Sequence, residues 1–251
     1  MPRHTTRLSV AIQVAGIGGN LMAQTTAPSV LEFEAGAAWQ QKNDVQLPND
    51  ASGTRFGLDR VSGSGPFFAP RVQFSTGLAP RHDLRLVFAP LGLKESGNLD
   101  QAANFQGQRF APGGVEAQYR FNSYRATWRY TLREDSDWTW KAGVTGKIRD
   151  AEITLRQGGV TSTKSDTGFV PLLHLYGERR LDSRSRITFE GDGLVSGRGR
   201  AIDLSLRYVR DFGDRVSGFA GVRLLDGGAD SNSLYNFARF HYLTVGLQYR
   251  M

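Results

Sequence analysis

From residue 30 onward, hydrophobic and polar side chains alternate with a period of two over long stretches of the chain. Residues 31–39 place Leu31 and Phe33 on one face and Glu32 and Glu34 on the other. Because successive side chains of a β-strand point to opposite faces of a sheet, this segment is predicted to be an amphipathic strand. The same alternation recurs in residues 123–132, 187–192 and 202–208.

The alternation also predicts how many strands there are. We expect about ten, each of about ten residues, whereas strands usually have about five or six residues. A hairpin over 104–121 would raise the number to twelve if it crossed a membrane, but we expect it to extend strands beyond the membrane. Residues 147–153 interrupt the alternation, which indicates a bulge or the end of the embedded part. The predicted strands cover residues 30–41, 66–78, 84–94, 121–133, 138–155, 167–180, 186–195, 201–212, 215–225 and 237–250.

The connections between the predicted strands alternate between short and long, and Trp and Tyr gather near the strand ends. Both features are typical of outer-membrane barrels. We therefore predict an all-β fold, a closed antiparallel up-and-down transmembrane β-barrel with both termini on the periplasmic side. The short connections lie around Ala79–Asp83, Glu134–Asp137, Leu181–Ser185 and Gly213–Asp214, and the long ones cover 42–65, 95–120, 156–166 and 226–236.

A soluble two-sheet sandwich or lipocalin-like barrel is the alternative fold, because alternation alone does not say which face is buried. That fold requires the apolar faces to point inward. The positions of Trp39, Trp128 and Tyr130 therefore discriminate between the two, since these side chains point outward only in a membrane barrel.

The first 23 residues have the order of a secretory signal. Residues 1–7 carry Arg3 and Arg7 without an acidic residue, and residues 8–23 are mostly apolar and small. We predict cleavage after Ala23, which divides the chain into a signal peptide over 1–23 and an outer-membrane barrel over 24–251. The alternative is a buried first helix of a cytosolic domain.

The composition excludes several classes of protein. The chain of 251 residues has no Cys, and its mean hydropathy is −0.37. No stretch approaches the roughly 18 consecutive apolar residues that indicate a membrane helix, and a disulfide scaffold is excluded. The net charge of +7 could suggest nucleic acid, but the Arg residues alternate with apolar residues along strands. We expect no nucleic-acid partner and expect loop Arg and Lys to meet acidic lipopolysaccharide.

The last twelve residues, FHYLTVGLQYRM, resemble the C-terminal strand of bacterial outer-membrane β-barrels. That strand carries alternating apolar residues, a Gly a few positions before the end and a terminal aromatic residue, for which Met251 stands here. The resemblance implies insertion into an outer membrane by the barrel-assembly machinery, and it implies no particular function. The residues that carry it are Leu243, Val245, Gly246, Leu247 and Tyr249.

The polar faces of the strands are expected to line the lumen. Charges in a narrow lumen need partners, so we expect a network of ion pairs that largely plugs the barrel, with a structural or surface-interaction role. No cofactor or metal is expected. The expected lumen charge network consists of Glu32, Glu34, Arg71, Arg85, Arg125, Arg129, Lys141, Glu190, Asp192, Asp203 and Arg207, with Gln73, Lys147, His174, Tyr176 and Glu178 beside it.

Two other functions stay open from the sequence. One is a narrow anion-preferring pore, because Arg and Lys around a water-filled bore favour anions. The other is a membrane-embedded hydrolase or lipid-modifying enzyme in which His174 acts as a base near Glu178, Glu190 and Asp192. We assign no catalytic residue, because same-face spacing occurs in any strand and neither Gly-x-Ser-x-Gly nor His-Glu-x-x-His is present.

Overall fold

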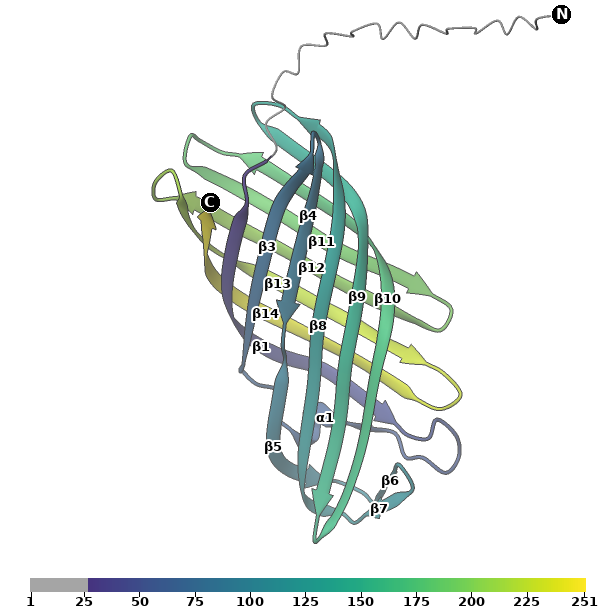
Figure 1. The fold of residues 1–251 in the computed structure, drawn as a ribbon. Helices are drawn as coiled ribbons and strands as arrows, with labels where there is room; N and C mark the ends of the chain where they lie inside the picture. The colour runs from purple at the N-terminus through teal and green to yellow at the C-terminus, as the bar shows by residue number, and fades with distance from the viewer. Residues whose placement is uncertain (1–26) are drawn as a thin grey trace, which may run out of the picture.

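The computed structural model describes residues 27–251, so the predicted signal peptide and its cleavage after Ala23 lie outside the described residues. Ten strands form a closed antiparallel sheet, in which the pairing of β1 with β14 completes the barrel (Figure 1). The predicted all-β closed barrel of ten strands is therefore confirmed, and the twelve-stranded alternative is wrong. No helix in residues 27–251 is long and apolar enough to cross a membrane.

The strands of the barrel follow one another around the wall in chain order, and β4 and β5 share one position because both pair with β8. The short elements β2, α1, β6 and β7 lie at the end of the barrel that carries the long connections (Figure 1). The elements are β1 Val30–Gln46, β2 Phe56–Gly57, α1 Leu58–Val61, β3 Phe67–Ala79, β4 His82–Ala89, β5 Gly92–Leu99, β6 Ala103–Phe105, β7 Gln108–Phe110, β8 Gly113–Glu134, β9 Trp138–Gln157, β10 Val160–Arg180, β11 Ser185–Ser196, β12 Gly199–Asp211, β13 Val216–Asp230 and β14 Tyr235–Arg250.

Apolar side chains face outward over the middle of the barrel, as the sequence predicts, and we call this band of side chains the outward apolar belt. Phe33 is 54% exposed, whereas its neighbour Glu32 is 2% exposed. Trp128 is also exposed, and Trp39 and Tyr130 share the outward face of their strands. The outward apolar positions of β8 run from Tyr124 to Leu132, close to the about 9–11 residues with which a tilted strand crosses a membrane. The soluble alternative is therefore wrong.

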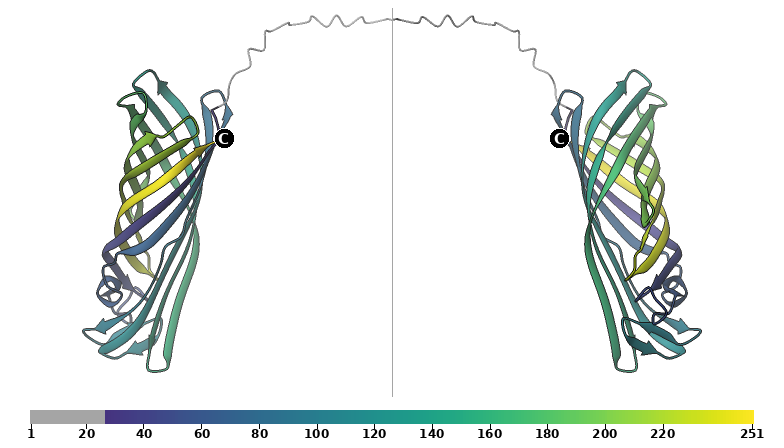
Figure 2. Two further views of the ribbon diagram at one scale, coloured as in Figure 1. Left: turned by 90° about the vertical axis from the view of Figure 1, so that its left-hand side faces the viewer. Right: turned by 90° about the vertical axis from the view of Figure 1, so that its right-hand side faces the viewer.

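Strands β8, β9 and β10 extend far beyond the others at the long-connection end (Figures 1 and 2). The predicted loops over 156–166 and 226–236 are mostly strand, because neighbouring strands stay paired there. Strands β9 and β10 are joined by a two-residue turn in which Gly158 and Gly159 have φ of 54° and 86°, which glycine adopts at little cost. Within 104–121, the short hairpin of β6 and β7 precedes an extension of β8.

The interruption of alternation in residues 147–153 is not a bulge. Strand β9 pairs with β8 and β10 across these residues without a shift of register. Instead, the polarity of the two faces changes, because Ile153 and Leu155 point into the molecule while Arg156 is exposed. Register shifts occur elsewhere, between Gln40 and Lys42 and between Thr131 and Arg133.

The opposite end of the barrel carries the short turns and both ends of the described chain (Figure 1). In the turn between β8 and β9, Asp135 Oδ1 accepts hydrogen bonds from the N–H groups of Asp137 (3.0 Å) and Trp138 (2.9 Å). These bonds stabilise the carboxylate and hold the pKa of Asp135 below its usual 3.8.

Replacing Asp135 by alanine is expected to destabilise the barrel at neutral pH, with a loss that shrinks in acid. Because the pKa of Asp135 is lower in the folded state, its contribution is present above the unfolded pKa and is lost as the pH falls through the folded pKa. Urea unfolding of both proteins at about pH 7 and about pH 2 measures the difference. Asp137→Ala in the same turn is the control, and an Asp135→Ala loss equal at both pH values contradicts the prediction.

Candidate functional site

Buried charged side chains fill the interior of the barrel at the level of the outward apolar belt. They come from alternate positions of eight strands, β1, β3, β4, β8, β9, β11, β12 and β13, because every second side chain points inward. Of the expected network residues, Lys141 is partly exposed. The buried ones are Glu32, Glu34, Arg71, Arg85, Arg125, Arg129, Glu190, Asp192, Asp203 and Arg207.

Asp192 lies at the centre of this network. Its carboxylate accepts hydrogen bonds from Arg125 Nη1 (2.8 Å) and Thr145 Oγ1 (2.7 Å), and Arg85 Nη1 is 3.4 Å away. His174 Nδ1 lies 2.8 Å from Asp192 Oδ1. Two guanidinium groups and one imidazole therefore surround a single carboxylate, so its negative charge is matched on several sides.

Two further carboxylates, which share Arg125 or Arg85 with Asp192, are paired in the same way. Asp203 accepts two parallel bonds of 2.7 Å from Arg223 and also pairs with Arg125. Glu190 lies 2.9 Å from Arg85 Nε and 3.5 Å from Arg129 Nη1. Because Arg85 and Arg125 each contact two carboxylates, the ion pairs form one connected network.

A second group of charges lies between β12 and β1. Arg207 donates to Glu32 at 2.7 Å and lies 2.8 Å from a carboxylate oxygen of Glu34. Gln248 donates a further bond of 2.8 Å to Glu32. Arg223, which binds Asp203, has its Nη1 4.0 Å from Glu34 Oε1, so the two groups belong to one layer of charge.

Two network members were missed in the sequence. Asp83, assigned there to a short turn, begins the inward face of β4 and pairs with Arg129 and Lys141. Arg223 lies on the inward face of β13 and binds Asp203. The alternation of Asp83 with Arg85 is the signal that could have identified the first of them.

His174 and its proposed catalytic partners are only partly brought together. The His174 side chain is fully buried, with Nε2 3.9 Å from Glu190 on one side and Nδ1 against Asp192 on the other. Glu178 lies apart, where it accepts a bond of 2.7 Å from Tyr176 and faces Arg186. Lys147 points inward against the Phe121 ring, 4.9 Å from its centre.

Of the two other histidines within residues 27–251, His82 stacks on Trp128, and His241 Nε2 lies 2.8 Å from Gln41 Oε1. In residues 27–251, no group of three His, Asp or Glu side chains could hold a metal ion.

A polar cavity of about 860 Å³, which we call the vestibule, opens at the short-turn end of the barrel. Glu190, Arg129 and Arg207 of the network belong to its lining, together with Tyr176 and Arg186. The network therefore forms the floor of this vestibule. On the other side of the network, the cavity beside Arg125 has a volume of only about 10 Å³, which is about the minimum that holds one water molecule.

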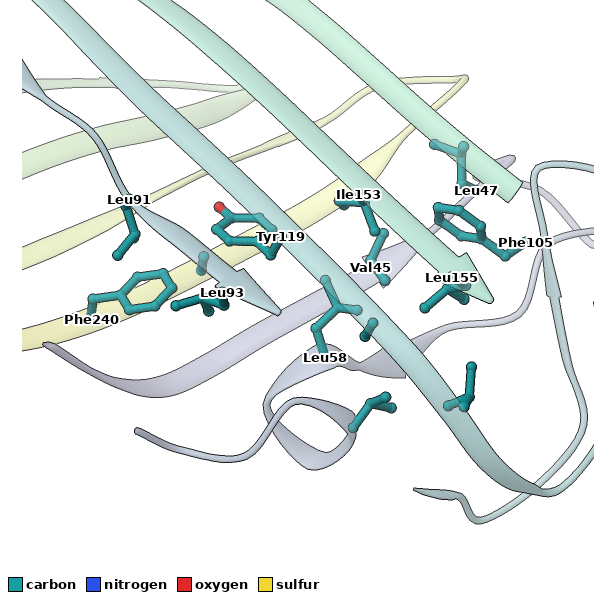
Figure 3. Close-up of a cluster of buried hydrophobic side chains, with 14 of the residues drawn as sticks. Val45, Leu47, Leu58, Leu91, Leu93, Phe105, Tyr119, Ile153, Leu155 and Phe240 are labelled. Atoms are coloured by element: carbon teal, nitrogen blue, oxygen red, sulfur yellow. The ribbon is translucent and has the colours of Figure 1, made fainter. Parts of the chain in front are cut away.

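Beyond that small cavity, most of the buried side chains are apolar, although Gln40 and Asn43 are buried beside them, so the lumen is not charged along its whole length. Leu58 of α1 and Phe105 of β6 fold into the long-connection end and pack among side chains of the barrel wall (Figure 3). Tyr119 and Phe240, on facing strands, have ring centres 6.1 Å apart. We call this cluster the apolar plug; its members include Val45, Leu47, Leu58, Leu91, Leu93, Phe105, Tyr119, Ile153, Leu155 and Phe240.

A closed antiparallel barrel with an outward apolar belt and a charged interior defines the class of transmembrane β-barrels that occur in bacterial outer membranes. No family model matches the sequence, and no curated protein matches it.

Among solved structures, the chain is similar to the outer membrane protease OmpT of Escherichia coli, at 8% identity and a TM-score of 0.58, over 92% of this chain and 99% of that chain. It also matches Neisserial surface protein A at 11% identity and a TM-score of 0.38, over 90% of this chain and 99% of that one. The attachment invasion locus protein Ail of Yersinia pestis matches at 9% identity and a TM-score of 0.41, over 90% of this chain and 100% of that chain. At 8% identity, the similarity to OmpT concerns the fold, and the resemblance expected from the sequence is confirmed at that level.

Proposed function

We propose that this protein is an outer-membrane barrel with a lumen closed to ions and a structural or surface-interaction role. In this proposal, a signal peptide is removed after Ala23, and both termini and the vestibule face the periplasm. The closing strand β14 would be read by the barrel-assembly machinery through its outward residues, Leu243, Val245, Leu247 and Tyr249.

The observation that best supports a closed lumen is that two different layers block it. The charge network spans the interior at the level of the apolar belt, and the apolar plug fills the long-connection end. Between them is a cavity of about 10 Å³, too small for a continuous file of water. Since a hydrated ion needs an aqueous path, this arrangement disfavours the narrow pore.

The surface-interaction role is supported by the extension of β8, β9 and β10 beyond the membrane. Its outward face is polar and carries cross-strand ion pairs, including Arg156 with Glu116 at 2.7 Å and Arg120 with Glu152 at 3.3 Å. Arg60 and Arg109 are exposed at the same end and would meet lipopolysaccharide phosphates.

The enzyme alternative receives no comparable support. A substrate would have to reach His174, whose side chain is fully buried between two carboxylates. The vestibule lining includes Glu190 but neither His174 nor Asp192.

The test is ion conductance in planar bilayers. Purified protein, verified as folded by its heat-modifiable gel migration, is expected to insert without current steps. The variant Arg125→Gln/Asp203→Asn keeps the net charge and is also expected to be silent, because the apolar plug still blocks the bore. Conductance of the unaltered protein with anion selectivity, abolished by neutralising Arg125 and Arg129, would establish the pore instead.

A further inference from the structure

The outer wall has a hollow where β12, β13, β14 and β1 run side by side near the short-turn end. This open groove has a volume of about 700 Å³, and apolar surface dominates its lining. Its walls include Phe33, Tyr208, Phe212 and Leu247. All four side chains point outward from the barrel, so the groove faces the hydrocarbon of the membrane rather than the lumen.

Two small residues of β13, which lie between larger side chains of β12 and β14, create the hollow. Register places Gly218 between Arg210 of β12 and Leu247 of β14. At the next outward position of β13, Ala220 lies between Tyr208 of β12 and Val245 of β14. With no side chain at Gly218, the Phe212 ring can lie over the strand; a Cβ atom there would be 2.6 Å from that ring.

An exposed arginine, Arg210, stands at the edge of the groove without a close ion pair, and the exposed Asp182 of the neighbouring turn is the acidic residue whose charge acts on it. Arg210 is exposed, and its Nη1 donates to Ser185 Oγ at 3.1 Å and approaches the Tyr208 hydroxyl at 3.5 Å. Among the ion pairs of residues 27–251, none involves Arg210. Arginine presents a planar fork of donors that matches a phosphate group.

We propose that this groove binds one anionic glycerophospholipid of the leaflet at the short-turn end, with an acyl chain in the groove and the phosphate on Arg210. The apolar walls match a hydrocarbon chain, and Arg210 lies one residue before the end of β12, towards the short turn. The site is on the outer wall, so it does not depend on whether the lumen conducts.

Another part of the wall offers a control for Arg210. Arg179 occupies a similar position on β10, with its guanidinium 5.3 Å above the Trp138 ring. Arg179 is likewise an exposed outward arginine beside an aromatic ring, but it does not line the groove, so it serves as a matched control.

The experiment counts the lipid molecules retained on the protein. Protein in a non-ionic detergent is mixed with phosphatidylglycerol or phosphatidylcholine of identical acyl chains, and native mass spectrometry records the bound lipid. We expect one retained phosphatidylglycerol, preferred over phosphatidylcholine. Arg210→Gln should weaken phosphatidylglycerol binding about tenfold or more, which corresponds to the loss of a charged hydrogen bond. Arg179→Gln should leave it unchanged.

Filling the groove tests the acyl-chain part of the proposal. Gly218→Leu should reduce retention of both lipids about tenfold. Ala220→Leu, at an exposed outward position, repeats the test if Gly218→Leu does not show the heat-modifiable migration of folded barrel. Unchanged lipid retention in the folded groove-filling variants would overturn the proposal. Equal losses for Arg210→Gln and Arg179→Gln, or a protein dimer in place of the lipid complex, would also overturn it.

Discussion

Replacing Asp192 by asparagine is expected to destabilise the barrel by about 3–5 kcal/mol, because it removes one partner of a buried ion pair. Asparagine keeps the shape of the side chain and removes its negative charge. Arg125, at 2.8 Å, and Arg85, at 3.4 Å, would each lose one of two carboxylate partners, which leaves an excess of buried positive charge around a neutral amide. Both guanidinium groups are buried and cannot turn to water.

The loss is measured by reversible urea unfolding in lipid vesicles, followed by tryptophan fluorescence. Asp166→Asn is the matched control, because Asp166 forms an ion pair with Arg149 in which both side chains are partly exposed. Exposed pairs contribute about 1 kcal/mol or less, so the control should change stability little. Equal losses for the two variants would contradict the importance of burial in the charge network.

Coupling between Asp192 and Arg125 is tested by combining substitutions at both positions. Because Arg125→Gln also removes the unmatched positive charge, the double variant should lose less stability than the sum of the single variants. Additive losses would mean that the two side chains do not stabilise one another, despite their contact.

Alternation along the sequence was sufficient to predict which side chains face inward within the membrane. Two neighbouring residues of β1 illustrate this, because Glu32 is 2% exposed and Phe33 is 54% exposed. The fold class follows from the same pattern, because a strand with one apolar and one charged face is stable in hydrocarbon only within a closed sheet.

Partners within the network could not be predicted in the same way. Arg125 and Asp192 are 67 residues apart and lie on β8 and β11, with β9 and β10 between them, so their contact depends on the curvature of the closed barrel. Asp83 was assigned to a turn, although the strand begins one residue before it. Strand ends are set by pairing with neighbours, which a single sequence does not contain.

The apolar plug was missed because polarity reverses along strands that cross the membrane boundary. On β8, Arg125 and Arg129 point inward at membrane level, whereas Tyr119 points inward beyond it and Arg120 points outward. The period of two persists, so the strand continues. The polar face of the strand, however, is the inward face within the membrane and the outward face beyond it. Above the membrane the barrel behaves as a soluble domain with an apolar core.

Replacing Phe240 by alanine is therefore expected to destabilise the protein by about 3–5 kcal/mol, as for large-to-small substitutions in soluble cores. Phe240 is 1% exposed and packs on Tyr119 and Tyr242, with ring centres 6.1 and 6.4 Å away. Its removal leaves a cavity among side chains that are held by the barrel wall and cannot collapse fully.

Phe68 provides the matched control, since it is 71% exposed on the outward face of β3 and would contact lipid. Phe68→Ala should cost about 0.3–0.6 kcal/mol, because lipid replaces the contacts that the ring loses. Urea unfolding in vesicles compares the two variants. A larger loss for Phe68→Ala would mean that the outward belt, rather than the apolar plug, holds this end of the barrel together.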